Sequence, residues 1–255
     1  MDHEFFVSTV FNDYIVHPVA QLFGYRTEHE VLPAHVVMIL LVSAGLMAFA
    51  VWFRRRLSVD SPGNLQQTLE LFAEWLAGMT DEIVGHGGRR YFPLVGALFL
   101  YIIVSNLLGL VPGFMSPTSN INVTLSCAVI VFIYYNFVGI RDNGFGKYLA
   151  HFAGPSLIIA PLLFPIEILS HLARPFSLSV RLFGNIFAEE LIVGILNSMF
   201  PFLISIPVMA LAVFASTVQA FIFVVLTMVY LGGAVEHAHE GDGPGHSEVE
   251  ESGHS

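Results

Sequence analysis

Long apolar runs constrain this chain more than any other feature of its sequence. A membrane-spanning helix needs about 20 mostly apolar residues, and runs of roughly this length lie at 36–53, 92–111 and 121–139. Longer apolar stretches follow at 165–198 and 208–234. Lipid admits only helices or closed barrels, and nothing here alternates with the period of two that a barrel strand requires. The sequence therefore predicts an all-α polytopic membrane protein with about five membrane helices.

The composition agrees with this class and argues against several others. Of 255 residues, 55% are hydrophobic and 12% are charged, whereas soluble domains carry about 25% charged residues. Lys and Arg are too few for nucleic-acid binding. The single Cys127 excludes a disulfide framework or a Cys-based metal site within one chain. The sequence shows no nucleotide loop, nucleophile elbow or zinc motif, so we expect no enzyme active site, cofactor or metal.

Basic residues predict how the chain is oriented. Loops rich in Lys and Arg stay on the cytoplasmic side of a membrane. Seven of the ten basic residues fall in loops that the alternation of spans places on that side: Arg54, Arg55, Arg56, Arg89, Arg90, Arg141 and Lys147. We therefore expect the N-terminus outside and the C-terminus in the cytoplasm.

Three regions are expected along the chain. Residues 1–35 form an N-terminal extracytoplasmic segment, 36–235 the membrane domain, and 236–255 an acidic, His-rich cytoplasmic tail. The tail holds six of the 20 acidic residues and four His, a composition typical of disorder. The irregular spacing of its His argues against a metal site.

An amphipathic helix is expected at 61–85, on the cytoplasmic face. Ser61 is its predicted N-cap and Pro62 its first residue. Apolar residues then recur at helical spacing: Leu65, Leu69, Phe72, Leu76, Met79 and Ile83. Such a helix either binds a partner or rests on the membrane surface.

Asn106, within the second span, likewise has two interpretations: a hydrogen bond between helices or the wall of an aqueous pathway.

The two C-terminal apolar stretches are too long for upright spans. As one helix, 165–198 would be about 50 Å long, against a hydrocarbon slab of about 30 Å. It is therefore strongly tilted, bent at Pro175, or both. Pro201 and Pro207 mark a turn, and 208–234 returns as a second long helix that ends at Gly232-Gly233. The pair forms a tilted hairpin.

The first helix of this hairpin carries charged residues where lipid disfavours them. On an ideal helix, Glu167, Arg174, Arg181 and Asn185 share one face, His171 and Glu189 lie at its edge, and Glu190 points almost oppositely. Groups of this kind in a membrane mark ion pathways or proton relays. Glu and His exchange protons, whereas Arg stays charged. Arg181 is thus either a fixed barrier in a proton path or half of an internal salt bridge to Glu167 or Glu189. For Arg174, near Pro175, a structural salt bridge is an equal alternative.

The segment RPFSLSVRLFGNIFAEELI, and QAFIFVVLTMVYL after it, carry a family resemblance. The pattern S-x-x-x-R-L-F-G-N, a Glu nine residues after its Arg, and Q-A-F-I-F resemble subunit a of the membrane (Fo) sector of rotary F-type ATP synthases. The likeness extends from the first span to Tyr230. It implies a non-catalytic, proton-translocating stator in the bacterial inner membrane. Its partners would be the c-subunit ring, the b-subunit stalk and lipid.

The resemblance also implies roles for individual residues. Arg181 would be the essential arginine that faces the ring and separates two half-channels. Asn185 would lie near the proton exit or entry route, and Glu190 and Gln219 would line a half-channel or stabilise Arg181. Glu167 would be a further polar group of a half-channel, and His171 would also belong to the proton-translocating set.

The chain departs from the family pattern at two positions. Glu189 stands where many bacterial relatives have Gly, and Ala212 stands where some carry a His. We hypothesise that Glu189 takes over the relay role of that absent His.

Two other classes of protein remain as alternatives. A secondary transporter or stand-alone channel would show internal repeats and broken helices in both halves, and the sequence shows no repeat. A membrane scaffold would use the charged residues only to join helices. Replacing Arg181 separates these classes from the stator.

Overall fold

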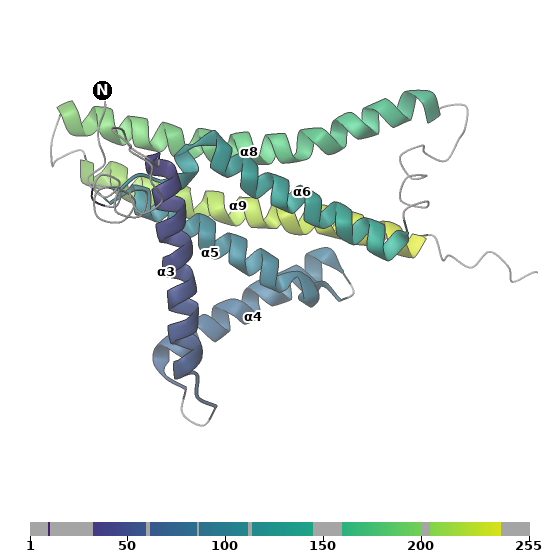
Figure 1. Cartoon of the computed structure of the whole chain (residues 1–255), viewed down its shortest axis with the longest axis horizontal. Coiled ribbons are helices and arrows are strands. Elements are labelled where there is room, and N and C mark those ends of the chain that lie inside the picture. Colours follow the sequence, from purple (N-terminus) through teal and green to yellow (C-terminus); the bar gives the residue numbers. More distant parts are fainter. Residues whose placement is uncertain are drawn as a thin grey trace, which may run out of the picture.

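The computed structural model describes Val10 and residues 33–59, 62–85, 87–111, 114–144, 160–199 and 205–240. Its main elements are α3 (Ala34–Arg56), α4 (Asn64–Val84), η2 (Gly88–Tyr91), α5 (Phe92–Gly109), η3 (Pro117–Ser119), α6 (Ile121–Asn143), α8 (Ala160–Met199) and α9 (Ser205–Glu240). All of them are helical, η2 and η3 being short 3-10 turns, so the all-α prediction is confirmed (Figure 1).

Within the described ranges, four helical stretches are long and apolar enough to cross a membrane. They are Ala34–Arg56, Gly88–Gly109, Ile121–Asp142 and Ile206–Val235. The fifth long helix, α8, has 40 residues and carries the charged residues described above. The prediction of a polytopic helical membrane protein is confirmed.

α8 and α9 form the predicted hairpin and organise the rest of the chain. They run in opposite directions along the longest axis of the molecule, and α3 runs across them (Figure 1). α9 packs against α4, α5, α6 and α8. Pro165 and Pro175 lie inside α8 without ending it, and the helix is bowed (Figure 1). The expected length is therefore accommodated by one continuous, bent helix.

The start of α4 differs from the prediction. The helix begins at Asn64 with Gly63 at its N-cap, so Pro62 precedes it; Ser61 lies outside the described residues. Side chains from the first turn hold the preceding segment instead. Gln66 exchanges two hydrogen bonds with the backbone of Ser58, and Gln67 Nε2 donates to the Pro62 carbonyl at 3.1 Å. By contrast, α6 has an ordinary side-chain cap: Asn120 Oδ1 accepts from the Asn122 amide at 2.9 Å.

The apolar side of α4 packs against other helices of the same chain. Leu76 and Val84 are buried, the rings of Phe72 and Phe99 lie 5.3 Å apart, and Trp75 stacks on Phe221 of α9 at 5.9 Å. The helix therefore covers α5 and α9. Leu65 and Leu71 remain exposed on it.

α9 passes through Gly232-Gly233, where the sequence predicts its end. Helix continues to Glu240, so residues 236–240 of the predicted tail are helical. A Cβ at Gly232 would lie 2.8 Å from the Ile83 carbonyl oxygen, so this glycine permits close packing with α4 and does not stop the helix. The His of the tail beyond 240, and the N-terminal segment apart from Val10, lie outside the described residues.

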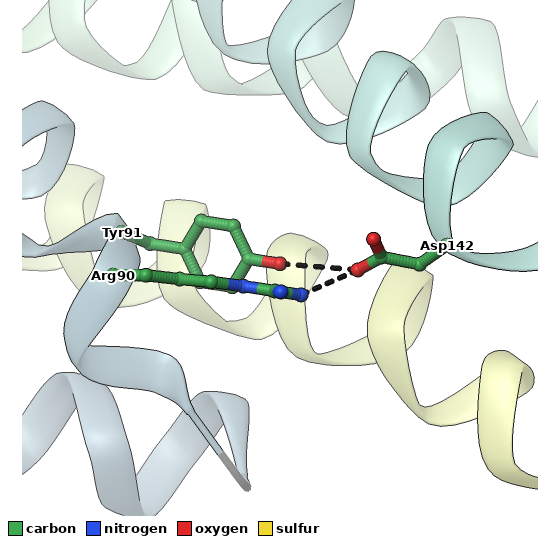
Figure 2. Close-up of polar contacts among 3 residues, drawn as sticks. All are labelled: Arg90, Tyr91 and Asp142. Carbon is green, nitrogen blue, oxygen red and sulfur yellow. Dashed lines mark hydrogen bonds and ion pairs between the residues drawn. The ribbon is translucent and has the colours of Figure 1, made fainter.

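The segments whose basic residues predict one membrane side lie together. The guanidinium of Arg90, in η2, forms an ion pair with Asp142 near the end of α6. The Tyr91 hydroxyl lies 3.4 Å from the same carboxylate oxygen (Figure 2). These contacts join η2 to the last turn of α6, at the two segments predicted to be cytoplasmic.

Candidate functional site

Arg181 points out of the helix bundle near the middle of α8. Leu178, Leu182 and Ile186 recur at intervals of four and are at most 2% exposed. Arg181 lies about 100° around the helix from this buried stripe and is exposed. Among the residues that the structure describes, its guanidinium makes no hydrogen bond and no ion pair. The salt-bridge alternative for Arg181 thus has no support in the described part of the chain.

The residues that surround Arg181 on its exposed side are small. Ser177, Gly184 and Ala188 lie within two turns of it and are all exposed. Larger apolar side chains, Phe176 and Phe187, flank this strip and are 64% and 49% exposed. The guanidinium therefore lies on a surface of small side chains, which another helix can approach closely.

The adjacent carboxylates Glu189 and Glu190 turn toward different elements. Glu189 Oε1 accepts from Asn185 Nδ2 at 2.9 Å, and its Oε2 accepts from Ser216 Oγ of α9 at 2.6 Å. Glu190 Oε1 accepts from the backbone N–H of Ser116, just before η3, at 3.1 Å. Neighbours on a helix diverge by about 100°, which accounts for the separation. Both acids remain half-buried.

A buried polar network lies beside these acids at the start of η3. Thr118 Oγ1 donates to Asn106 Oδ1 at 2.6 Å, and Asn106 Nδ2 donates to the Ser216 carbonyl at 3.3 Å. Ser116 Oγ donates to the Ser105 carbonyl at 3.0 Å. Asn106 is 2% exposed. Its interpretation as a hydrogen bond between helices is therefore confirmed.

Gln219 lies one turn beyond Ser216 on α9 and is 6% exposed. Its Nε2 has no hydrogen-bond partner among the described residues. A buried unpaired amide is rare and calls for a water or a functional partner. It makes no hydrogen bond with Arg181 in this structure, so the expected stabilisation of Arg181 is not seen here.

A second polar cluster lies in the N-terminal half of α8. His171 Nε2 is 3.5 Å from Glu167 Oε1, and the Tyr135 hydroxyl is 3.3 Å from His171 Nδ1. The Arg174 guanidinium lies 5.7 Å from the centroid of the Tyr230 ring. Arg174 is thus held against an aromatic face, and the part of the chain that the structure describes offers it no salt bridge, which was one expectation for it.

The predicted site residues consequently fall into two groups on either side of Arg181. Along α8 the first group, at Glu189 and Glu190, starts about 12 Å beyond it, and the second, at His171 and Glu167, starts about 15 Å before it. The groups do not meet in one pocket. Among the described residues, no cluster of three His, Cys, Asp or Glu could hold a metal.

The sequence alone did not mark Ser116, Thr118 and Ser216 as part of the first group. Their hydroxyls are common in membrane helices and loops, so single residues carry little signal. The only hint was that Ser216 and Gln219 lie three residues apart on one side of an otherwise apolar helix.

Comparison with known proteins identifies the family. A family model described as ATP synthase A chain matches residues 36–232. ATP synthase subunit a of Solibacter usitatus is 42% identical over 233 residues, covering 90% of this chain and all of that protein. ATP synthase subunit a 1 of Syntrophotalea carbinolica is 43% identical, covering 83% and 90%. ATP synthase subunit a of Geobacter sulfurreducens is 47% identical over 178 residues, covering 70% and 77%. This chain therefore belongs to the ATP synthase A chain family.

Proposed function

We propose that the chain is the proton-translocating stator of a rotary ATP synthase, with Arg181 acting on a carboxylate of the c-subunit ring. Family membership makes it subunit a of the membrane sector, a proton-channel subunit that is not itself an enzyme.

The charge of Arg181, exposed and without an ion pair among the described residues, is the observation that carries the proposal. Placing an Arg against lipid costs at least about 2.5–3.5 kcal/mol. The exposed position of Arg181 is therefore better explained by a partner protein that covers this side of α8. A carboxylate about 4 Å away would be attracted by about 4 kcal/mol at an effective dielectric of 20. Arg181 would therefore favour proton release from each ring carboxylate that reaches it.

The two polar groups supply the offset half-channels of the proposal. Glu190 and Glu189 lie beside the turn expected outside, and Glu167 and His171 lie toward the end expected in the cytoplasm. The buried side chains of Leu178, Leu182 and Ile186 fill the bundle between them. Protons would enter through one group, travel on the ring, and leave through the other, while Arg181 blocks a direct leak.

Glu189 is the group we propose as the relay in place of the family's His. Its two hydrogen bonds, to Asn185 and Ser216, hold it between α8 and α9. Gln219 lies one turn beyond Ser216 on α9. Its buried amide nitrogen has no partner among the described residues, which suits a water or the Arg181 side chain in the assembled complex.

The proposed partners fit the exposed surfaces. The c ring would cover the small residues around Arg181. α3 buries only Val37, Met38 and Val42, near its expected outer end, which leaves most of its length for lipid or for the b-subunit stalk. The chain would lie in the bacterial inner membrane with its N-terminus outside and its C-terminus in the cytoplasm.

Substitution of Arg181 tests the stator proposal. Arg181→Ala should abolish coupled ATP synthesis in membrane vesicles while the complex still assembles, because the side chain makes no contact that holds the described fold. Arg174→Ala is the matched control and should retain synthesis. Normal synthesis in the Arg181 variant would overturn the proposed coupling role of Arg181.

A further inference from the structure

Three buried polar residues link the η3 turn to Glu189. Thr118 Oγ1 donates to Asn106, Asn106 donates to the carbonyl of Ser216, and Ser216 Oγ donates to Glu189, over distances of 2.6, 3.3 and 2.6 Å. The three are 0%, 2% and 0% exposed. We call them the Thr118–Asn106–Ser216 bridge. They come from η3, α5 and α9, so the bridge spans three elements that meet only in the folded chain.

We propose that Ser216 and Asn106 are positioning residues for Glu189, and that the Ser216 hydroxyl lets this acid gain and lose a proton without moving. The proposal rests on the proposed function, because it takes Glu189 to be part of the proton path. It adds two residues that carry no charge and that no sequence motif marks.

A hydroxyl suits this position because it can both donate and accept hydrogen bonds. When Glu189 is ionised, Ser216 O–H donates to Oε2. When a proton arrives on Oε2, the new carboxyl O–H donates to Ser216 Oγ. The Ser216 hydrogen then turns to a carbonyl of the preceding helical turn, a bond that Ser often makes. Asn185 donates to Oε1 in both states, so the side chain stays in place.

The bridge holds Glu189 and does not itself conduct protons. The links at Asn106 are a side-chain amide donor and the backbone carbonyl of Ser216, and amide groups keep their protons where hydroxyls and carboxyls exchange them. No continuous relay therefore runs from Thr118 to Glu189. Glu189 is half-buried and exchanges protons through its exposed side.

A double-mutant cycle in the complete ATP synthase tests the proposal. Ser216→Ala and Thr118→Val would each be made with Glu189 and with Glu189→Gln, and ATP-driven proton pumping would be measured per assembled complex. With Glu189 present, we expect Ser216→Ala to lower pumping about tenfold and to change its pH profile, and Thr118→Val to lower it about two- to threefold. With Glu189→Gln, neither should lower it further.

Thr227→Val is the matched control for a lost buried hydroxyl. Thr227 is 0% exposed and donates only within its own helix, to the Phe223 carbonyl at 2.9 Å, so pumping should match the unmodified complex. Equal losses from Ser216→Ala in both Glu189 backgrounds, unchanged pumping, or a loss explained wholly by less assembled complex would each overturn the proposal. Normal ATP synthesis in Arg181→Ala would instead overturn the stator function, so the two failures are distinguishable.

Discussion

Gly232 of α9 lies so close to Ile83 of α4 that a Cβ on the glycine would be 2.8 Å from the Ile83 carbonyl oxygen. A neighbouring backbone cannot rotate away as a flexible side chain can. The contact therefore sets how closely the amphipathic helix α4 approaches α9. It also means that an added Cβ would clash at Gly232 but not at the neighbouring Gly233.

Gly232→Ala should destabilise the chain by about 1–3 kcal/mol, as overpacking does. Gly233→Ala is its control, because nothing lies within 4 Å of a Cβ at Gly233. There the better helix propensity of Ala is worth about 1 kcal/mol. Thermal dissociation of the purified complex would measure both. Equal behaviour of the two variants would contradict the close approach of α4.

Glu190→Gln should lower ATP-driven proton pumping at least tenfold and leave assembly intact. The Gln carbonyl oxygen can still accept from the Ser116 amide, so the α8–η3 contact survives while the titratable group is lost. Proton-transfer groups typically contribute two or more orders of magnitude. Glu190→Asp, which still titrates, is the comparison, and full pumping in the Gln variant would remove Glu190 from the proton path.

Tyr230→Leu should weaken the packing of α8 on α9 without stopping ATP synthesis. It removes the ring beneath the Arg174 guanidinium, a contact worth about 0.5–2 kcal/mol. Tyr230→Phe keeps the ring and should resemble the unmodified chain. Thermal dissociation and synthesis would be measured together, and loss of synthesis with unchanged stability would assign Arg174 to proton translocation instead.

Asp142→Asn should cost less than about 1 kcal/mol, because Arg90 is half exposed and such pairs are screened by water. Exchanging the charges, as Arg90→Asp with Asp142→Arg, should restore most of the loss. Stability at low and high salt is the measurement, with a smaller effect expected at high salt. A loss that does not depend on salt would point to packing around Tyr91 and not to charge.

Apolar run length and charge placement were enough to predict the helices, because lipid leaves few other structures. Helix ends were less predictable. Asn120 caps α6 as its residue type suggests, whereas α4 starts after Pro62 because Gln66 and Gln67 hold the preceding segment. α9 continues past Gly232, where the sequence predicts its end, because that glycine allows α9 to pack closely against α4.

In the charged stretch from Glu167 to Glu190, too, the sequence determined some features and the tertiary structure determined others. Helical periodicity alone placed Arg181 and Glu190 on different sides, because side-chain direction in a helix depends only on residue spacing. Which groups those side chains meet depended on the tertiary structure. Only the folding of α5, η3 and α9 onto α8 brought Ser116 to Glu190 and Ser216 to Glu189 and left Arg181 uncovered, since contacts across 27 to 110 positions are set by helix packing.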